Sequence, residues 1–310
     1  MELRHLRCFL AVAQELHFAR AAEKLHIEQS PLSRAIKELE EELGVRLFDR
    51  NTRSTRLTRS GQVFAEHVPR VFAALTQAKD SVRAVSAGYQ GQLRIALSGG
   101  ISQSRLTVLL SRCREEEPDT EIRLYEVSLV QQIKGLESDL YDAGFAQSPE
   151  VDESLLAVPA WSDPVVVAVP SRHPLLIHKQ LPLEEVLRYP LVLCDPTTCE
   201  GGCRQLARVL RTTALEPIVA ERVASHDLMV TLVAAGYGLG FSTEAHVSTS
   251  HHPEIVTRPL AGRTPVLTTY LIRRIGEPSE ALHRFVERAL VEVPVRASDE
   301  ALDTSLGGSK

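Results

Sequence analysis

The sequence predicts a mostly helical winged helix-turn-helix at the N-terminus, then a long linker helix and a larger α/β region. Three observations support this order. Apolar residues recur at intervals of three and four over the first 43 residues, a heptad pattern runs from Phe64 to Val85, and strand and helix patterns alternate from residue 92. Such alternation is typical of largely parallel sheets, and the roughly 200 residues involved favour two linked lobes.

The 310 residues carry a formal net charge of −5, and 44% of them are hydrophobic. No apolar run approaches the roughly 18 residues that span a bilayer, and the first residues lack a signal-peptide layout, so we expect a cytoplasmic protein. Five scattered cysteines favour reduced thiols over a disulfide framework. Residues 1–60 hold 11 Lys and Arg against 9 Asp and Glu, although the whole chain is acidic. This local positive balance suits a small domain that meets DNA phosphates.

The apolar spacing near the N-terminus predicts helices over residues 3–14, 18–25 and 31–43. Ser30 suits the N-cap of the third helix and Pro31 its first position, because a helix start leaves the N–H that proline lacks unbonded. The second and third helices, joined by a short polar turn, predict a helix-turn-helix.

The third helix and the turn before it present polar side chains away from the apolar stripe. Arg and Lys bind guanine edges, Gln pairs with adenine, and Ser reaches a phosphate or a base. A plain solvated amphipathic helix would show the same pattern, but a basic segment follows it. That segment predicts a two-stranded wing with strands near 46–48 and 55–58. The residues expected to face DNA from the helix are Gln29, Ser33, Arg34 and Lys37.

Residues 59–88 predict one long helix, and its heptad seam is typical of a helix paired with a second helix. Pro69 lies inside this run and predicts a bend near residues 65–69. The seam expected to pair two chains consists of Phe64, Val68, Val71, Leu75, Ala78, Val82 and Val85.

The α/β region contains eight predicted strands and five predicted helices. The strands are expected at 92–97, 121–127, 143–146, 164–169, 190–194, 217–223, 238–242 and 265–272. The helices are expected at 102–116, 129–138, 201–213, 226–236 and 278–292.

Residues 1–90 resemble the N-terminal region of LysR-type transcriptional regulators. The resemblance is carried by ELRHLRCFLAVA, by AAEKLHIEQSPLSRAIKELEEELGVRLFDR and by LTRSG, which opens the linker helix. His17 departs from the family pattern, in which Ser often precedes the second helix. The resemblance implies DNA contacts from residues of the turn, the third helix and the wing. Those residues are Gln29, Ser30, Pro31, Ser33, Arg34, Arg50 and Arg53.

The same resemblance implies a regulator, expected to be an activator, that binds promoter DNA, meets RNA polymerase and assembles as a dimer of dimers, a homotetramer. It also implies a C-terminal α/β domain with two lobes like those of periplasmic binding proteins, joined by two crossing strands. The expected parts are a DNA-binding domain 1–58, a linker helix 59–88, an effector-binding domain 89–293 and a disordered tail 294–310. Lobe I is expected at 92–161 with 266–293, and lobe II at 162–265.

Ligands of open α/β sheets bind at the loops that follow the carboxyl ends of strands. The loop after 92–97 has glycines that allow close backbone approach and hydroxyls that could hold a carboxylate. Each loop in this set, taken singly, could also owe its Gly, Pro, Ser and Thr residues to ordinary turn formation. The residues expected to contact a small-molecule inducer are Ser98, Gly99, Gly100, Ile101, Ser102, Ser128, Leu129, Gln147, Pro196, Thr197, Thr198 and His226.

Within the family, the sequence is most similar to regulators of aromatic-compound degradation. The opening ELRHLR and the DAGF motif at 142–145 carry this similarity. Gly100 stands where muconate-responsive members have Ser, and Gln147 stands where they have Arg. A dicarboxylate is therefore disfavoured, and a monocarboxylate or a neutral aromatic molecule is expected.

Two other functions were weighed. The sequence contains no P-loop, GxSxG or GxGxxG motif, so we expect neither an enzyme nor a bound cofactor or metal. The crowding of Cys194, Cys199 and Cys203 supports a thiol-based redox sensor as an alternative, because a helix start nearby could lower a thiol pKa.

Overall fold

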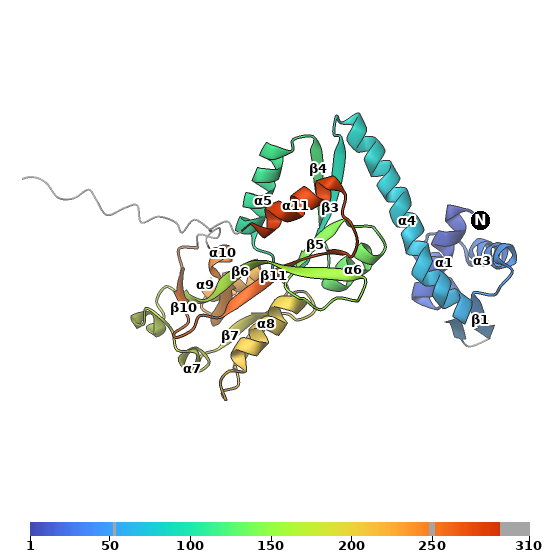
Figure 1. Cartoon of the computed structure of the whole chain (residues 1–310). Helices are drawn as coiled ribbons and strands as arrows, with labels where there is room; N and C mark the ends of the chain where they lie inside the picture. The colour runs from blue at the N-terminus through green and yellow to red at the C-terminus, as the bar shows by residue number, and fades with distance from the viewer. Residues whose placement is uncertain (52–53, 248–251, 292–310) are drawn as a thin grey trace, which may run out of the picture. The chain divides into compact units, whose positions relative to one another are not determined.

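The computed structural model describes residues 1–51, 54–247 and 252–291, with the side chains of residues 50, 51 and 54 excepted. Arg53 and the predicted tail 294–310 lie outside the described residues. The chain forms two compact units (Figure 1). One comprises Met1–Asp80 with Ser138–Leu140, and the other holds the remaining described residues.

Three helices pack around one apolar core in the N-terminal unit: α1 (Leu3–Glu15), α2 (Phe18–Lys24) and α3 (Gln29–Leu43). Their inward faces supply the fully buried Phe9 and Ile36, and the small side chains of Ala21 and Ala22 let helices approach closely. The predicted helix-turn-helix is confirmed.

The start of α3 differs from the prediction. The helix begins at Gln29 with Glu28 as its N-cap, so the assignment of Ser30 as the N-cap is wrong. Proline is tolerated anywhere in a first helical turn, because N–H groups there have no partner within the helix, and Pro31 therefore does not fix the start. The helix ends as predicted at Gly44, which adopts φ +68°.

The wing consists of β1 (Phe48–Asn51) and β2 (Ser54–Leu57), paired antiparallel. Its first strand begins two residues later than predicted. The reason lies in α3, where the Glu40 carboxylate accepts hydrogen bonds from the backbone N–H of Leu47 and of Phe48 at 2.7 and 3.1 Å. These bonds tie residues 47 and 48 to α3, and the strand pairing starts only at Phe48.

The linker helix α4 (Arg59–Ser86) runs without interruption through Pro69. Two residues of the predicted seam pack on the core of the N-terminal unit instead. Val68 is 1% exposed inside the N-terminal core, and Phe64 packs partly on the same core with its ring 4.9 Å from that of Phe9. The prediction that Val68 faces a partner is wrong, because the three-helix unit needs this part of α4 to close its own core. The later positions Val71, Val82 and Val85 are exposed by 44%, 67% and 70%.

The first lobe of the second unit has a parallel group of strands: β3 (Gly91–Leu97), β4 (Thr120–Glu126) and β5 (Ala143–Ala146), with β3 in the middle. Helices α5 (Gln103–Glu116), α6 (Leu129–Glu137) and α11 (Glu280–Leu290) accompany them. The core of this lobe includes the stacked rings of Phe145 and Trp161, whose centroids are 4.6 Å apart.

The second lobe repeats this plan. Strand β7 (Leu191–Cys194) lies between β8 (Val219–Val223) and β9 (Leu239–Thr243), parallel to both. Strand β10 (Ile255–Pro259), absent from the sequence prediction, pairs antiparallel with β6. The helical segments are η1 (Pro174–Ile177), α7 (Leu183–Val186), α8 (Glu200–Leu210), α9 (His226–Ala234) and α10 (Glu244–Val247).

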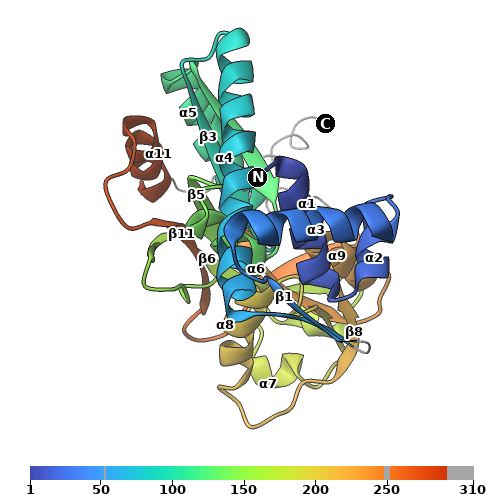
Figure 2. The ribbon, with the colours of Figure 1, turned by 90° about the vertical axis from the view of Figure 1, so that its right-hand side faces the viewer.

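Two long strands join the lobes. Strands β6 (Leu155–Pro170) and β11 (Val266–Arg274) pair antiparallel and run side by side in both views of the ribbon (Figures 1 and 2). Strand β6 is 16 residues long, whereas only its second half was predicted from the apolar run 164–169. The sheet order β4-β3-β5-β11-β6-β9-β7-β8 makes the centre antiparallel and the outer strands parallel. Among the described residues, no helix has the length and apolarity needed to cross a membrane.

The exposed part of the α4 seam remains a prediction of pairing between two chains. We expect Val71→Asp with Leu75→Asp to abolish linker pairing and to reduce the tetramer to a smaller assembly held by the effector domains, because two buried carboxylates in a helix seam lack cationic partners. Analytical ultracentrifugation of the full chain measures this. Lys79→Asp, placed on α4 outside the seam, is the control and should keep the assembly state of the unaltered chain. An unchanged sedimentation coefficient of the double variant would contradict the pairing role.

Candidate effector site and DNA-binding surface

The DNA-facing residues predicted on α3 lie on one surface of the N-terminal unit. Gln29, Ser30, Pro31, Arg34 and Lys37 are exposed. Ser33 is half-buried. Lys37 is 3.4 Å from Glu41 one turn later, whereas Arg34 makes no hydrogen bond or ion pair within the described residues. The N-terminal half of α3 therefore presents an unpaired guanidinium between small polar side chains, as a helix that reads base edges does. The Arg50 side chain and all of Arg53 lie outside the described residues.

A cavity of about 480 Å³ lies between the two lobes, where several strands end. It is lined by the loop after β3, the loop after β4, the loop after β7 and the first residue of α9. Parallel strands bring their carboxyl ends to the same edge of a sheet, which is why loops far apart in sequence meet here. The structure thus brings together Gly99, Gly100, Ile101, Ser128, Thr197, Thr198 and His226 from the predicted set.

Three predicted contact residues line neither this cavity nor the one described next. The Ser98 hydroxyl donates a 3.3 Å hydrogen bond to the Phe145 carbonyl, and Ser102 is 2% exposed with its hydroxyl 2.9 Å from that of Ser104. Leu129 is buried as the first residue of α6. The prediction that Ser98, Ser102 and Leu129 contact the ligand is wrong, because their side chains pack or form hydrogen bonds inside the protein.

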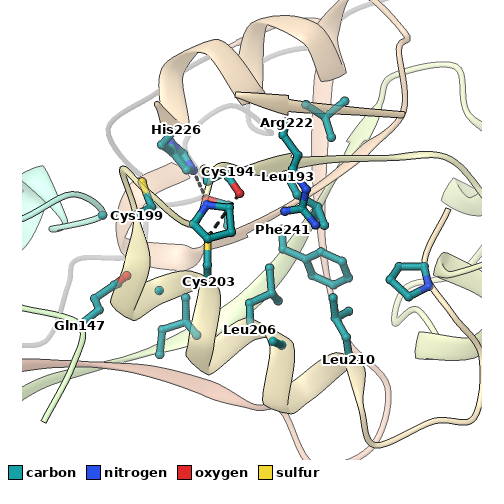
Figure 3. Close-up of a pocket in the computed structure, with 18 of the residues that line it drawn as sticks. Gln147, Leu193, Cys194, Cys199, Cys203, Leu206, Leu210, Arg222, His226 and Phe241 are labelled. Carbon is teal, nitrogen blue, oxygen red and sulfur yellow. Dashed lines mark hydrogen bonds between the residues drawn. The ribbon is translucent and has the colours of Figure 1, made fainter. Parts of the chain in front are cut away.

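A second cavity, of about 410 Å³, runs along α8, mostly in lobe II, and adjoins the first (Figure 3). The two share Gly100, Cys199, His226 and His246 in their linings. Gln147 and Pro196, both predicted as ligand contacts, line this second cavity. This cavity was not predicted, because its walls come from ordinary apolar positions of α8 and the sheet: Val192, Leu193, Leu206, Leu210 and Phe241.

Two histidines form the wall between the cavities. The rings of His226 and His246 are 4.4 Å apart, and Nε2 of His226 is 2.7 Å from the Ser242 hydroxyl. Burial, together with the neighbouring His246, lowers the pKa of His226 to about 3, and burial also lowers the pKa of His246. Both rings are therefore neutral at physiological pH and offer hydrogen bonds without charge.

The three clustered thiols lie on the wall of the α8 cavity and are free. A hydrogen bond from the Cys194 thiol lowers the pKa of Cys199 to about 7, and the donating Cys194 has its own pKa raised. Burial raises the pKa of Cys203 to about 11, and its Sγ donates to the Cys194 carbonyl at 3.3 Å. Within the described residues, no group of three or more His, Cys, Asp or Glu side chains is arranged to hold a metal ion.

The Gln205 side chain on α8 links the second lobe to the first and to a crossing strand. Its Nε2 donates to the Gln147 carbonyl at 2.8 Å and to the Thr268 carbonyl at 2.7 Å, and its Oε1 accepts from the Thr268 N–H at 2.8 Å. Gly201 packs so closely that a Cβ there would lie 2.5 Å from the Gln147 carbonyl. On the opposite side, the Ser104 hydroxyl of α5 donates to the Ala245 carbonyl at 2.7 Å.

Comparison with known proteins identifies both parts of the chain. Residues 3–62 match the family "Bacterial regulatory helix-turn-helix protein, lysR family", and residues 86–292 match "LysR substrate binding domain". The regulator AlsR of Bacillus subtilis is 31% identical over 241 residues, which cover 78% of this chain and 80% of AlsR. The regulator BenM of Acinetobacter baylyi is 31% identical over 241 residues, covering 77% and 79% of the two chains.

A solved structure has the same fold over most of the chain. The crystal structure of full-length CbnR complexed with its target DNA superposes with a TM-score of 0.69, at 25% identity over 93% of this chain and 99% of CbnR. The family match assigns residues 86–292 to effector binding, so redox sensing by the three thiols is not favoured. The chain belongs to the LysR family: it is a DNA-binding transcriptional regulator in which a helix-turn-helix is followed by a two-lobed effector-binding domain.

Proposed function

We propose that a small aromatic molecule, a monocarboxylate or a neutral compound, binds between the two lobes and controls transcription from the promoter bound by α3 and the wing. The observation that carries this proposal is the interlobe cavity, around which seven independently predicted residues gather. Its lining combines hydroxyl groups, neutral histidines and the backbone of two glycines with the carboxylates of Glu126 and Asp227, and these groups can make oriented hydrogen bonds to a small ligand.

The aromatic class of the effector is supported by the similarity to BenM and to a probable cat1 operon activator of Acinetobacter lwoffii, which is 30% identical over 240 residues. In the DAGF motif that suggested the aromatic regulators, Asp142 pairs with Arg94 at 2.7 Å, and the other three residues form the start of β5. Gln147 in place of an arginine, and Gly100 in place of a serine, argue against a dicarboxylate held at that end.

A ligand in this position contacts both lobes, and it therefore favours the closed arrangement over an open one. In a dimer of dimers, closure would change how the effector domains meet and so the spacing of the DNA-binding domains. The coupling expected for such a change is about 1–3 kcal/mol. We propose that this alters DNA bending and access by RNA polymerase, with activation as the outcome in the cytoplasm.

The DNA-contact proposal is tested at Arg34. We expect Arg34→Ala to weaken binding to the specific promoter site by about 1–3 kcal/mol and to relax base preference, because a guanidinium contacting a base edge is lost. Fluorescence anisotropy with promoter and scrambled duplexes at fixed salt measures both effects. Arg114→Ala, on α5, is the matched control and should bind as the unaltered chain does. Unaltered promoter affinity of Arg34→Ala would show that α3 does not read the bases in this way.

The effector site is tested at Thr198. We expect Thr198→Trp to fill the interlobe cavity and abolish the transcriptional response to the inducer, while promoter affinity is retained because Thr198 belongs to the other unit. A reporter gene assayed with and without inducer, together with gel-shift titrations, gives both quantities. Thr231→Trp places the same bulk on an exposed position of α9 and should respond normally. A normal response from Thr198→Trp would show that the inducer does not bind in this cavity.

A further inference from the structure

Arg222 places a positive charge on the α8 face of the lobe II sheet. It lies on β8 directly opposite Leu193 of β7, so the two side chains share one face. The next residue, Val223, points to the other face, into the core beneath α9. Leu193 belongs to the apolar core that continues toward α8, and Figure 3 shows the Arg222 side chain reaching toward the space between Cys203 and Phe241. The guanidinium thus lines the α8 cavity.

Arg222 makes no hydrogen bond or ion pair through its guanidinium within the described residues. The charge of Arg222 acts on Asp195, whose pKa is lowered first by hydrogen bonds from Thr197 and also by Arg222. That carboxylate already accepts bonds from the Thr197 N–H and hydroxyl at 2.7 and 2.6 Å. The other charged groups of the lining are Glu216 and Arg211, in and before the loop that leads from α8 to β8. Arg222 is therefore available to an anion from outside the chain.

The opposite end of the cavity is polar but neutral. Gln147 is 6% exposed, lines the cavity, and makes no side-chain hydrogen bond within the described residues. In Figure 3 it lies across the cavity from Arg222, beyond Cys199 and Cys203. Cys199 and Cys203 line the cavity between Gln147 and Arg222, and Leu206, Leu210 and Phe241 form an apolar wall along α8 and beside Arg222. The cavity therefore offers a guanidinium next to an apolar wall, and a neutral hydrogen-bonding group on its Gln147 side.

We propose that the effector is an organic monocarboxylate that extends from the interlobe cavity into the α8 cavity, where its apolar body packs on α8 and its carboxylate pairs with Arg222. This inference rests on the proposed function and specifies the ligand class for it. Arg222 of lobe II would then bind the anion. Gln147 is uncharged and stands where the muconate-responsive regulators have an arginine. A guanidinium pairs with a carboxylate through two parallel hydrogen bonds, which gives charge and orientation together.

An inward-pointing charge on an edge strand has a second use, because it discourages sheets of different molecules from joining. Strand β8 is at the end of the sheet order and Arg222 is exposed overall, so this role must be separated from ligand binding by experiment.

The test measures binding of two probes of equal shape, 4-ethylbenzoate and the neutral 4-ethylbenzamide, to the full chain by isothermal titration calorimetry. We expect the unaltered chain to prefer the carboxylate. Arg222→Gln should weaken carboxylate binding by roughly tenfold or more and change amide binding by less than about twofold, since only the charged pair is lost. Arg208→Gln removes the same charge from α8 at a position outside the cavity lining and should leave both affinities unchanged.

Two further variants place the ligand. Ala207→Phe fills the α8 cavity and should abolish carboxylate binding, whereas Thr198→Trp fills the interlobe cavity. Loss of binding in Thr198→Trp but not in Arg222→Gln or Ala207→Phe would overturn the inference and leave the proposed function intact. Loss in Arg222→Gln and Ala207→Phe alone would retain the Arg222 site and reject the interlobe placement. No carboxylate binding by the unaltered chain, or self-association as the only effect of Arg222→Gln, would overturn the inference.

Discussion

The side-chain amide of Gln205 is the interaction on which the arrangement of the effector domain depends. A single residue of α8 bonds to the backbone of the first lobe at Gln147 and to both backbone groups of Thr268 on a crossing strand. Each such bond contributes about 0.5–1.5 kcal/mol net, and a buried amide left unpaired costs more than that. The position of α8 is therefore fixed relative to both lobes, and α8 is also a wall of the α8 cavity.

This placement connects ligand binding to the hinge. A molecule in the α8 cavity contacts Leu206, the next residue after Gln205, and a molecule in the interlobe cavity contacts the loop that leads into the same helix. Gly99 and Gly201 remove the side chains that would otherwise separate the lobes, since a Cβ at Gly99 would lie 2.5 Å from the Thr198 carbonyl. Short contacts therefore hold the two lobes together, among them the Gln205 hydrogen bonds and the Ser104–Ala245 hydrogen bond. Such contacts can be rearranged by the modest free energy that a small ligand supplies.

The sequence predicted much of the fold because the dominant signals were local. Helical spacing located α1, α2 and α3, and short apolar runs located most strands of both lobes. The errors have specific physical causes. Glu40 delays the wing strand through a side-chain bond across eight residues, and Val68 is drawn into the three-helix core although its heptad position suggests a partner helix. Neither effect is visible in residue spacing.

Only the part of the site that lies beyond the ends of strands could be predicted from the sequence. The rule that ligands bind beyond the carboxyl ends of strands brought Thr197, Thr198 and His226 to the interlobe cavity. It could not identify the α8 cavity, whose walls are apolar residues indistinguishable from core, nor Arg222, whose orientation depends on strand register with Leu193. Ser98 and Ser102 follow the same strand-end rule but turn inward, because internal acceptors lie closer than the cavity.

Gln205 holds the lobes in register, and hydrogen–deuterium exchange of the full chain measured by mass spectrometry tests this role most directly. The Thr268 N–H donates to Gln205, so its exchange reports this bond. In Gln205→Ala we expect faster exchange in the peptides that contain Thr268 and α8, with unchanged protection in β3 and β7. Arg208→Ala on the same helix removes only an exposed ion pair with Glu150 at 3.8 Å, which contributes little, and should exchange as the unaltered chain does. Equal protection of Thr268 and α8 with and without the Gln205 side chain would contradict the account.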